Sequence, residues 1–531
     1  MTAKGNGAKG DGMTAGRLLS ACPVCDGDHL EYLFHVAGVR VEKCAGCGLL
    51  LRNPQPAESG RSAATARPAD EGSCAVRNAE AQLARIARYR AEYGAEGPTR
   101  ILHIGPGGAE FRQSALSRGH DVVICESGEC QGGMAALPEA SFDVCVVSDM
   151  IERQRDPAAT LDLLHARLVP GGVMLVSVPS LEGWPGKSLG ERWGRITPEN
   201  LFYFDTETIT GLLFKRGFQD IFPARERRVV PLRRAGPRFR RIPWGGALLR
   251  AIAHLPRRLR DRPVTAATGN IAVLARRSPD PPPIGGERTL SVILPAYNEA
   301  QTFAQVMERL LAKSIEGIAI QIIVVESAST DGTREAAMAY RDHPRVKLIL
   351  QDRPQGKGNA VRAGLREATG DFVLIQDADL EYDIDDYEML IEPLRTFRRA
   401  FVLGSRHTRE GSWKIRKFRN QMLVGVVMNI AHVGLTWLYN VLYHQKTRDP
   451  FTMYKVFRRD CISHMPFECD RFDFDCELVA KLARRGYCPL EVPINYQARS
   501  YSEGKKIRFF RDPPTYVKAF LKYRFQNDAV F

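Results

Sequence analysis

A run of acidic side chains closes one apolar segment of the sequence. In VLIQDADLEYD (Val373 to Asp383), apolar residues lead into Asp377, Asp379, Glu381 and Asp383, with one residue between successive acids. Side chains two apart lie on the same face of an extended strand, so the spacing predicts that these carboxylates share a face. Carboxylate oxygens suit Mg²⁺ or Mn²⁺, which can bridge the phosphates of a nucleotide. The segment indicates a divalent metal site, and a solvated acidic loop is the alternative for the motif alone.

Four cysteines form two pairs with metal-ligand spacing. CPVC holds Cys22 and Cys25, CAGC holds Cys44 and Cys47, and eighteen residues separate the pairs. Two CxxC knuckles at this spacing make a tetrahedral thiolate zinc site. Four protein ligands leave no open position, so we expect structural zinc with a small hairpin between the knuckles. The other cysteines, of twelve in all, are scattered, which suits a reducing cytosol better than a disulfide scaffold.

Length and composition indicate several folded domains. The chain has 531 residues, 44% hydrophobic and 26% charged, which fits two to four globular domains. The start of the chain is rich in Gly, Ala and Lys without an apolar core, which predicts a flexible tail and not a signal peptide. The expected order is the tail at 1–16, a zinc ribbon at 17–56, an α/β domain at 95–277, a Pro- and Gly-containing linker at 278–288 and a second α/β domain at 289–531.

The net charge of +14 is concentrated in one segment. Thirteen arginines stand between Arg225 and Arg262, against Glu226 and Asp261, in an expected insertion at 225–262. The segment either binds phosphate groups of anionic lipid or nucleic acid, or is a solvated insertion. Interleaved apolar residues favour lipid over nucleic acid. A zinc-ribbon protein that binds nucleic acid is the least favoured alternative.

One apolar stretch is long enough to reach across a bilayer. Gln421 to Gln445 contains no Asp, Glu, Lys or Arg, and a span needs about 20 residues. Asn429, His432 and Asn440 interrupt the stretch. We therefore expect a buried or interfacial helix in place of a membrane span.

The first α/β domain opens with a strand that enters a Gly-rich turn, TRILHIGPGGAEF (Thr99 to Phe111). Such turns let backbone amides approach a ligand. With the strand–helix–strand pattern of Ser141 to Ser180 and the last strand GNIAVLARR, the chain from Cys22 to Arg277 resembles class I S-adenosylmethionine-dependent methyltransferases of the branch with an N-terminal zinc ribbon. The resemblance implies a Rossmann-like fold. It implies a cofactor site at Gly105, Gly107 and Glu126.

This domain departs from the family pattern in three places. His103 stands where the family usually has an acidic residue before the glycines. After Glu126 the chain runs almost directly into the next strand, without the helix and strand that complete the adenine pocket. Glu152 and Arg153 replace a Glu-His pair. An active methyltransferase and a degenerate domain kept as a scaffold or docking surface both remain open.

The second α/β domain places polar clusters after successive strands. PAYNE, STDGT, GKGNAVRAGL and QDADLEYD each follow an apolar strand. Alternating strands and helices predict a mainly parallel sheet, whose ligands lie beyond the carboxyl ends of the strands. We therefore expect one crevice to collect Glu299, Glu326, Asp331, Lys357, Asp377 and Asp379.

These motifs resemble glycosyltransferase family 2 and its GT-A fold from Leu290 to about Phe525, in the subgroup similar to dolichyl-phosphate mannosyltransferase and bacterial polyprenyl-phosphate glycosyltransferases. The resemblance implies a divalent metal at Asp377, Asp379 and Glu381. It implies a nucleotide-sugar site at Pro295, Tyr297, Glu299, Glu326, Asp331, Lys357 and Asp377. Glu326 and Ser327 replace the usual paired aspartates, which puts the nucleotide preference in doubt.

Basic side chains downstream suit phosphate groups. Arg406, Arg416 and Lys505 are the candidates to hold donor and acceptor phosphates, since guanidinium forks match phosphate oxygens and Lys supplies a point charge. Surface charge is the alternative for each. Asp473 and Asp475 either include a base or anchor the basic loop. A lipid phosphate acceptor needs no strong base, whereas a hydroxyl acceptor needs one, with Asp475 the nearest.

The sequence therefore predicts a cytoplasmic glycosyltransferase at the inner face of the membrane. It would move a sugar from a nucleotide-diphosphosugar to a polyprenyl phosphate, with Asp379, Asp475 and Arg406 as the catalytic candidates and Mg²⁺ or Mn²⁺ as Lewis acid. The alternative is a bifunctional enzyme that also uses S-adenosylmethionine on a polysaccharide or secondary metabolite.

Overall fold

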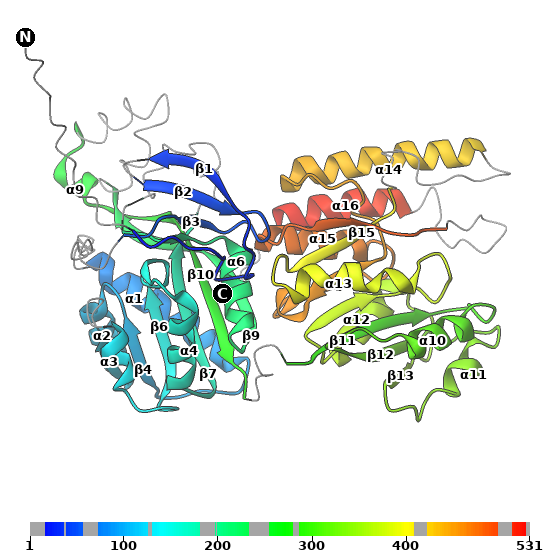
Figure 1. The fold of residues 1–531 in the computed structure, drawn as a ribbon, viewed down its shortest axis with the longest axis horizontal. Helices are drawn as coiled ribbons and strands as arrows, with labels where there is room; N and C mark the ends of the chain where they lie inside the picture. Colours follow the sequence, from blue (N-terminus) through cyan, green and yellow to red (C-terminus); the bar gives the residue numbers. More distant parts are fainter. Residues whose placement is uncertain are drawn as a thin grey trace, which may run out of the picture.

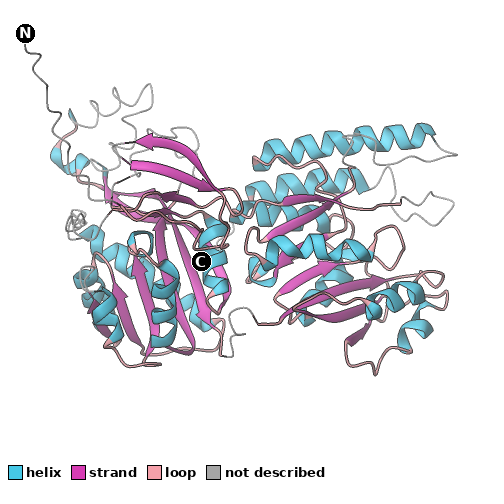
Figure 2. Cartoon of the chain, viewed as in Figure 1, coloured by secondary structure: helices cyan, strands magenta, loops and turns pink. Residues whose placement is uncertain are grey.

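Two α/β bodies lie side by side, and a small β-sheet covers one end of the first (Figure 1). The computed structural model describes residues 16–36, 39–56, 73–125, 130–180, 197, 199–232, 254–279, 286–407, 422–497 and 512–526. In both bodies helices flank a central sheet (Figure 2). This is the expected α/β fold class, with the cysteine-rich hairpin at its N-terminal end.

The hairpin predicted between the cysteine knuckles is present. Strands β1 (Leu30–Val36) and β2 (Val39–Cys44) pair antiparallel, with Leu30 opposite Cys44. Strands β3 (Leu50–Arg52) and β8 (Phe202–Tyr203) extend it to a sheet of order β1-β2-β3-β8. Because β8 comes from the following domain, main-chain hydrogen bonds join the ribbon to that domain.

The first large sheet has the order β5-β4-β6-β7-β10-β9. Its strands are β4 (Arg100–Ile104), β5 (Asp121–Cys125), β6 (Phe142–Ser148), β7 (Leu168–Pro179), β9 (Phe218–Pro231) and β10 (Pro263–Arg277). The four strands β5, β4, β6 and β7 are parallel, and β10 is antiparallel to both neighbours. The helices of this domain are α1 (Ser73–Ala91), α2 (Gly108–Leu116), α3 (Cys130–Ala135), α4 (Pro157–Arg167) and α6 (Thr206–Lys215).

The Arg-rich segment joins two strands of this sheet. Its first residues, through Pro231, belong to β9, and β10 begins at Pro263 after a short helix, α9 (Arg257–Arg260). Residues 233–253 lie outside the described part of the chain. The described ends of the segment therefore belong to two paired strands of the sheet.

The second large sheet has the order β13-β12-β11-β14-β16-β15-β17. Its strands are β11 (Arg288–Ala296), β12 (Ile318–Glu326), β13 (Val346–Leu350), β14 (Phe372–Ile375), β15 (Phe401–Ser405), β16 (Lys455–Arg458) and β17 (Leu490–Pro493). The first four strands in this order are parallel, as predicted, and β16 is antiparallel. Its helices include α10 (Phe303–Ala312), α11 (Thr333–Met338), α12 (Lys357–Glu367), α13 (Tyr387–Arg395) and α15 (Phe474–Arg485).

The apolar stretch forms one long helix on the outside of the second body. Helix α14 (Met422–Tyr443) runs beside α16 (Asp512–Phe525) (Figure 1). Its protein-facing side carries polar residues, since Asn429, His432 and Thr436 are all buried. Its outer side is apolar. The protein-facing side also buries Met428, Tyr439 and Tyr443, so it is mixed, whereas an ordinary surface helix turns its polar face to water.

Candidate active site

The turns that follow β11 and β12 are bonded to each other. The Asn298 amide donates to Ser329 Oγ at 3.0 Å, and the Glu299 amide donates to Thr333 Oγ1 at 2.8 Å. Asp331 accepts a hydrogen bond from Thr333 Oγ1 at 2.6 Å. Burial works to raise the pKa of Asp331, but hydrogen bonds to its carboxylate, the largest from Thr333, lower it below the usual value. Two of the predicted nucleotide-site loops therefore form one braced edge.

Glu326 holds the turn after β12 by a hydrogen bond to its main chain. Its side chain is fully buried, accepts a hydrogen bond from the Ser329 amide at 2.6 Å and lies 3.4 Å from the guanidinium of Arg334. Tyr297, in contrast, is 38% exposed at the end of β11, where Pro295 is half-buried. Of the predicted residues here, Glu326 positions the turn, and Tyr297 presents a surface for a ligand.

Lys357, the first residue of α12, lies among carboxylates from other elements. Its Nζ forms an ion pair with Asp377. Burial works to lower the pKa of Lys357, but the charges of Asp377, Asp475 and Asp379 raise it above the usual value. Asp475, near the start of α15, also accepts a 2.9 Å hydrogen bond from the buried Lys455 of β16. Four predicted site residues, Lys357, Asp377, Asp379 and Asp475, thus lie close together.

The acidic run does not lie on one strand face as predicted. Strand β14 ends at Ile375, so the acids follow in a turn and point to different partners. Glu381 accepts from the Tyr496 hydroxyl at 2.9 Å, and Asp383 accepts from Arg309 at 2.5 Å. The alternation that places every second side chain on one face ends with the strand.

The acidic residues do not yet form a compact ligand set. In the described residues, the four cysteines are the one group of three or more possible metal ligands whose ligand atoms all lie within 4.8 Å of one another. The acidic side chains after β14 do not form such a group. Carboxylates are nonetheless the donors that a divalent ion prefers. An ion at Asp377, Asp379 and Glu381 would compete with Lys357 for Asp377. The chemistry of this donor set fits Mg²⁺ or Mn²⁺.

Arg406 directly follows β15 and is held by a residue without a sequence signal for the role. Its Nε and Nη2 donate to the two oxygens of the fully buried Asp449 at 2.8 and 2.7 Å. The guanidinium lies 5.3 Å from the ring centre of Tyr496. Burial works to lower the pKa of Arg406, but Asp449 raises it well above the usual value. The other predicted phosphate ligands, Arg416 and Lys505, lie outside the described residues.

Asp449 connects this arginine to helix α14. His432 Nε2 lies 3.7 Å from Asp449 Oδ1 and within 3.2 Å of the Arg448 carbonyl oxygen. On the other side, Glu491 accepts hydrogen bonds from the Arg448 and Asp449 amides. The long helix therefore packs directly against the groups that hold Arg406.

The four cysteines gather as the spacing predicts. Cys22 and Cys47 Sγ are 3.5 Å apart, as are Cys25 and Cys44 Sγ, and all four residues are buried. Tetrahedral zinc with bonds of about 2.3 Å places its sulfurs about 3.8 Å apart. The thiolates therefore fit one Zn²⁺ with a closed ligand set.

Comparison with known families assigns both large domains. Residues 291–465 match the model of the family described as glycosyl transferase family 2, and residues 76–221 match the model described as methyltransferase domain. The C-terminal domain is a family 2 glycosyltransferase domain.

Curated relatives match this glycosyltransferase domain. A dolichol-phosphate mannosyltransferase of Pyrococcus furiosus is 24% identical over 216 residues, 41% of this chain and 58% of that protein. A dolichyl-phosphate beta-glucosyltransferase, ALG5A, of Trichomonas vaginalis is 29% identical over 222 residues, 39% of this chain and 65% of that protein. The chain spans roughly three fifths of the length of these relatives. Among solved structures, glucosyl-3-phosphoglycerate synthase from Mycobacterium tuberculosis with UDP aligns at a TM-score of 0.34 and 20% identity, over 46% of this chain and 82% of that one.

In the described residues the methyltransferase domain keeps its glycine turn, but His103 stands where an acidic residue was expected before it. Gly105 and Gly107 have φ values of 114° and 85°, and a Cβ on Gly105 would meet the Ser148 carbonyl oxygen. His103 is buried, and its ring centre lies 4.8 Å from that of Phe111. A histidine at this position supplies no carboxylate to accept hydrogen bonds from a ligand. Burial lowers the pKa of His103 to about 4.

The sheet confirms that this domain is shortened. Strand β5 is an edge strand, and in the described residues only α3 lies between β5 and β6. The wall that a further strand would supply beyond β5 is therefore absent from that part of the chain. Glu126 lies outside the described residues. The groups that are described do not fit a complete S-adenosylmethionine site.

Proposed function

We propose that this chain transfers a sugar from a nucleotide-diphosphosugar to a polyprenyl phosphate at the cytoplasmic face of a membrane. The main support is a cluster of charged residues in the family 2 glycosyltransferase domain: Lys357, Asp377, Asp379 and Asp475. The cluster lies beyond the carboxyl ends of the parallel strands. Ligands of such sheets bind at this edge.

The donor would lie along this edge. Tyr297, Glu299 and Asp331 would contact the base and ribose from the braced turns, and the Lys357 ammonium would face the diphosphate. A divalent ion on Asp377, Asp379 and Glu381 would supply Lewis-acid stabilisation of the leaving diphosphate. Since Lys357 now neutralises Asp377, its release toward the donor phosphates would free that carboxylate for the ion.

The acceptor would approach from the side of Arg406. Asp449 aims the guanidinium by holding two of its nitrogens, and Arg416 and Lys505 would add positive charge. A phosphate acceptor is already anionic, so the site needs no strong base. Asp475, which is paired with Lys455, would then help to hold Lys357. The dolichol-phosphate enzymes among the relatives support this class of acceptor.

Helix α14 supports the membrane location. Its outer side exposes a stripe of apolar residues at helical spacing: Val427, Ile430, Val433, Trp437 and Val441. Trp437 is 65% exposed, and Leu521 and Phe525 of the neighbouring α16 are exposed as well. Contiguous apolar surface of this kind marks a contact with lipid or protein. The window Val426–Tyr443 is long and apolar enough to span a bilayer, and a third of it is buried in the protein. One such helix is weak evidence for a membrane span.

The decisive test of the acceptor uses two lipids that differ in one group. A panel of labelled nucleotide sugars is incubated with the protein and Mg²⁺ or Mn²⁺, with either polyprenyl phosphate or the matching polyprenol. We expect label in the organic phase with the phosphate and not with the alcohol. Donor hydrolysis without lipid labelling would refute the acceptor, and equal labelling of both lipids would refute recognition of the phosphate.

A bifunctional enzyme is the second candidate, because residues 76–221 match a methyltransferase family. Titration calorimetry with S-adenosylmethionine separates the two candidates. The shortened domain predicts no heat of binding at micromolar concentration. Micromolar affinity would revive methyl transfer.

A further inference from the structure

One hydrophobic core runs through all three modules. The largest buried apolar cluster contains Cys47 of the ribbon, Leu212 of α6, Val292 of β11 and Val456 of β16. Because separate domains each have their own core, a shared core indicates that the modules are stabilised together.

Helix α6 is the element that joins the ribbon to the glycosyltransferase domain. At its end, Lys215 Nζ donates to the Val24 carbonyl oxygen at 3.2 Å and to Asp26 Oδ2 at 2.5 Å, both in the first cysteine knuckle. The neighbouring Phe214 ring lies 6.4 Å from that of Phe372 and 6.3 Å from that of Phe397, both in the glycosyltransferase domain. A single helix thus contacts both partners through adjacent residues.

The second knuckle touches the glycosyltransferase domain directly. Arg399, just before β15, donates from Nη1 to the Gly46 carbonyl oxygen at 3.4 Å, and its Nε lies 3.7 Å from Glu207 of α6. A Cβ on Gly46 would lie 3.7 Å from Arg398 Cγ and 3.3 Å from Cys25 Sγ. The backbone that holds the thiolates therefore packs against the turn into β15.

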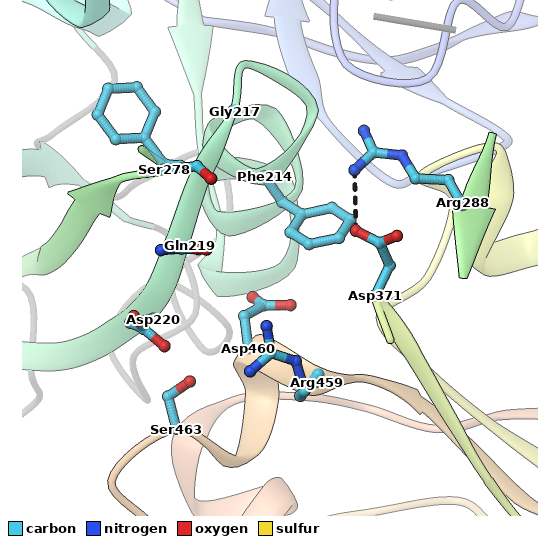
Figure 3. Close-up of a pocket in the computed structure, with 11 residues that line it drawn as sticks. Phe214, Gly217, Gln219, Asp220, Ser278, Arg288, Asp371, Arg459, Asp460 and Ser463 are labelled. Carbon is cyan, nitrogen blue, oxygen red and sulfur yellow. Dashed lines mark hydrogen bonds and ion pairs between the residues drawn. The ribbon is translucent and has the colours of Figure 1, made fainter. Parts of the chain in front are cut away.

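A buried arginine closes the same boundary. Arg458, at the end of β16, donates to Thr210 Oγ1 of α6 at 2.9 Å and pairs with Asp460 at 3.0 Å. Beside it lies a pocket of about 40 Å³, with Phe214 and Asp220 on one wall and Arg459 on the other (Figure 3). That volume holds a few water molecules and no organic ligand.

We infer that zinc bound at the ribbon stabilises the glycosyltransferase domain through α6 and the turn before β15. Strand β15 runs from this turn to Ser405, next to Arg406, and β16 runs from Lys455, next to Asp475, to Arg458. One end of each strand therefore lies at the boundary and the other at the candidate site. Loss of zinc would let the knuckles separate and expose the boundary ends of both strands. The inference does not depend on the donor or acceptor.

Hydrogen exchange measured by mass spectrometry tests this coupling. The folded chain is compared before and after zinc is removed by a chelator, and again after zinc is restored. We expect amides in β15 and β16 to exchange at least about tenfold faster without zinc and to recover with it, because local opening sets the exchange rate. Unchanged exchange in both strands, while the ribbon exchanges freely, would overturn the inference.

Variants give a second line of evidence. Cys47→Ser removes one zinc ligand, and Arg399→Ala removes a boundary contact while leaving every ligand in place. Both should accelerate exchange in β15, whereas Glu367→Gln, which breaks an exposed ion pair with Lys347 at the β13 edge of the sheet, should not. If Cys47→Ser fails to fold, Arg399→Ala and the chelated wild type decide the question. Wild-type exchange in Arg399→Ala would contradict the proposed route.

Discussion

Arg458 of the glycosyltransferase domain donates a 2.9 Å hydrogen bond to Thr210 of the methyltransferase domain, 248 residues earlier in the chain. Both side chains are buried, and the Arg458 guanidinium also lies 5.1 Å from the Phe214 ring centre. A buried charge at a domain boundary requires partners that stay in place. This contact ties the two domains into one unit.

Arg458→Ala should therefore destabilise the protein strongly. It leaves Asp460 as a buried, unpaired carboxylate, which costs about 3–5 kcal/mol. Urea unfolding followed by circular dichroism measures the loss. The matched control is Arg395→Ala, whose partner Glu392 is exposed and whose loss should cost at most about 1 kcal/mol. Equal stability of the two variants would refute a structural role for the boundary arginine.

Asp449→Asn should impair acceptor use more than donor use. The substitution removes the charge that aims Arg406, and a small misplacement of a positioning group can cost about a hundredfold in rate. Steady-state kinetics should show a tenfold to hundredfold lower kcat/KM for the acceptor with little change in donor KM. Glu367→Gln, in an exposed pair with Lys347, is the control. A higher KM for the donor, with unchanged kinetics for the acceptor, would contradict this assignment of Arg406.

His103 makes stability depend on pH. Burial holds its pKa at about 4, below the usual 6.5, so the folded state keeps the imidazole neutral where the unfolded chain takes up a proton. Stability from this group is present above pH 6.5 and is lost as pH falls toward 4. The total is about 3 kcal/mol at 1.36 kcal/mol per pH unit. Unfolding of wild type and His103→Asn across this range isolates the effect. Parallel curves would contradict it.

Membrane binding should depend on the outer face of α14. Ile430→Glu with Trp437→Glu places two charges on the exposed apolar stripe, and each charge opposes transfer into the lipid interface. Flotation with anionic vesicles should show binding by wild type and at least about tenfold less by the double variant. Leu116→Glu, at a similarly exposed leucine of the methyltransferase domain, should float like wild type. Equal flotation of all three proteins would remove α14 from the interface.

The features readable from the sequence are those set by nearby residues. Each cysteine knuckle lies within one short motif, and the spacing of the two knuckles predicted the thiolate cluster. The partners of site residues were not readable, since Asp449 lies 43 residues from Arg406 and Thr210 lies 248 from Arg458. Folding alone brings such pairs together.

The acidic run was misjudged for a related reason. Alternation predicts a shared face only while a strand continues, and β14 ends at Ile375, where its pairing with neighbouring strands ends. Pairing depends on residues far away in the chain. Likewise, the composition of α14 predicted an interfacial or buried helix, but only the fold shows that its polar side faces the protein.

Metal-dependent sugar transfer by wild type and by Asp379→Asn is the measurement closest to the central claim. Labelled donor, polyprenyl phosphate and Mg²⁺ or Mn²⁺ are supplied to both proteins, after matched thermal unfolding shows that the variant is folded. We predict transfer by wild type that stops when Mg²⁺ and Mn²⁺ are left out and falls at least about a hundredfold in Asp379→Asn, since this buried carboxylate lies beside Lys357. Transfer by the folded variant at the wild-type rate would contradict the assignment of the active site.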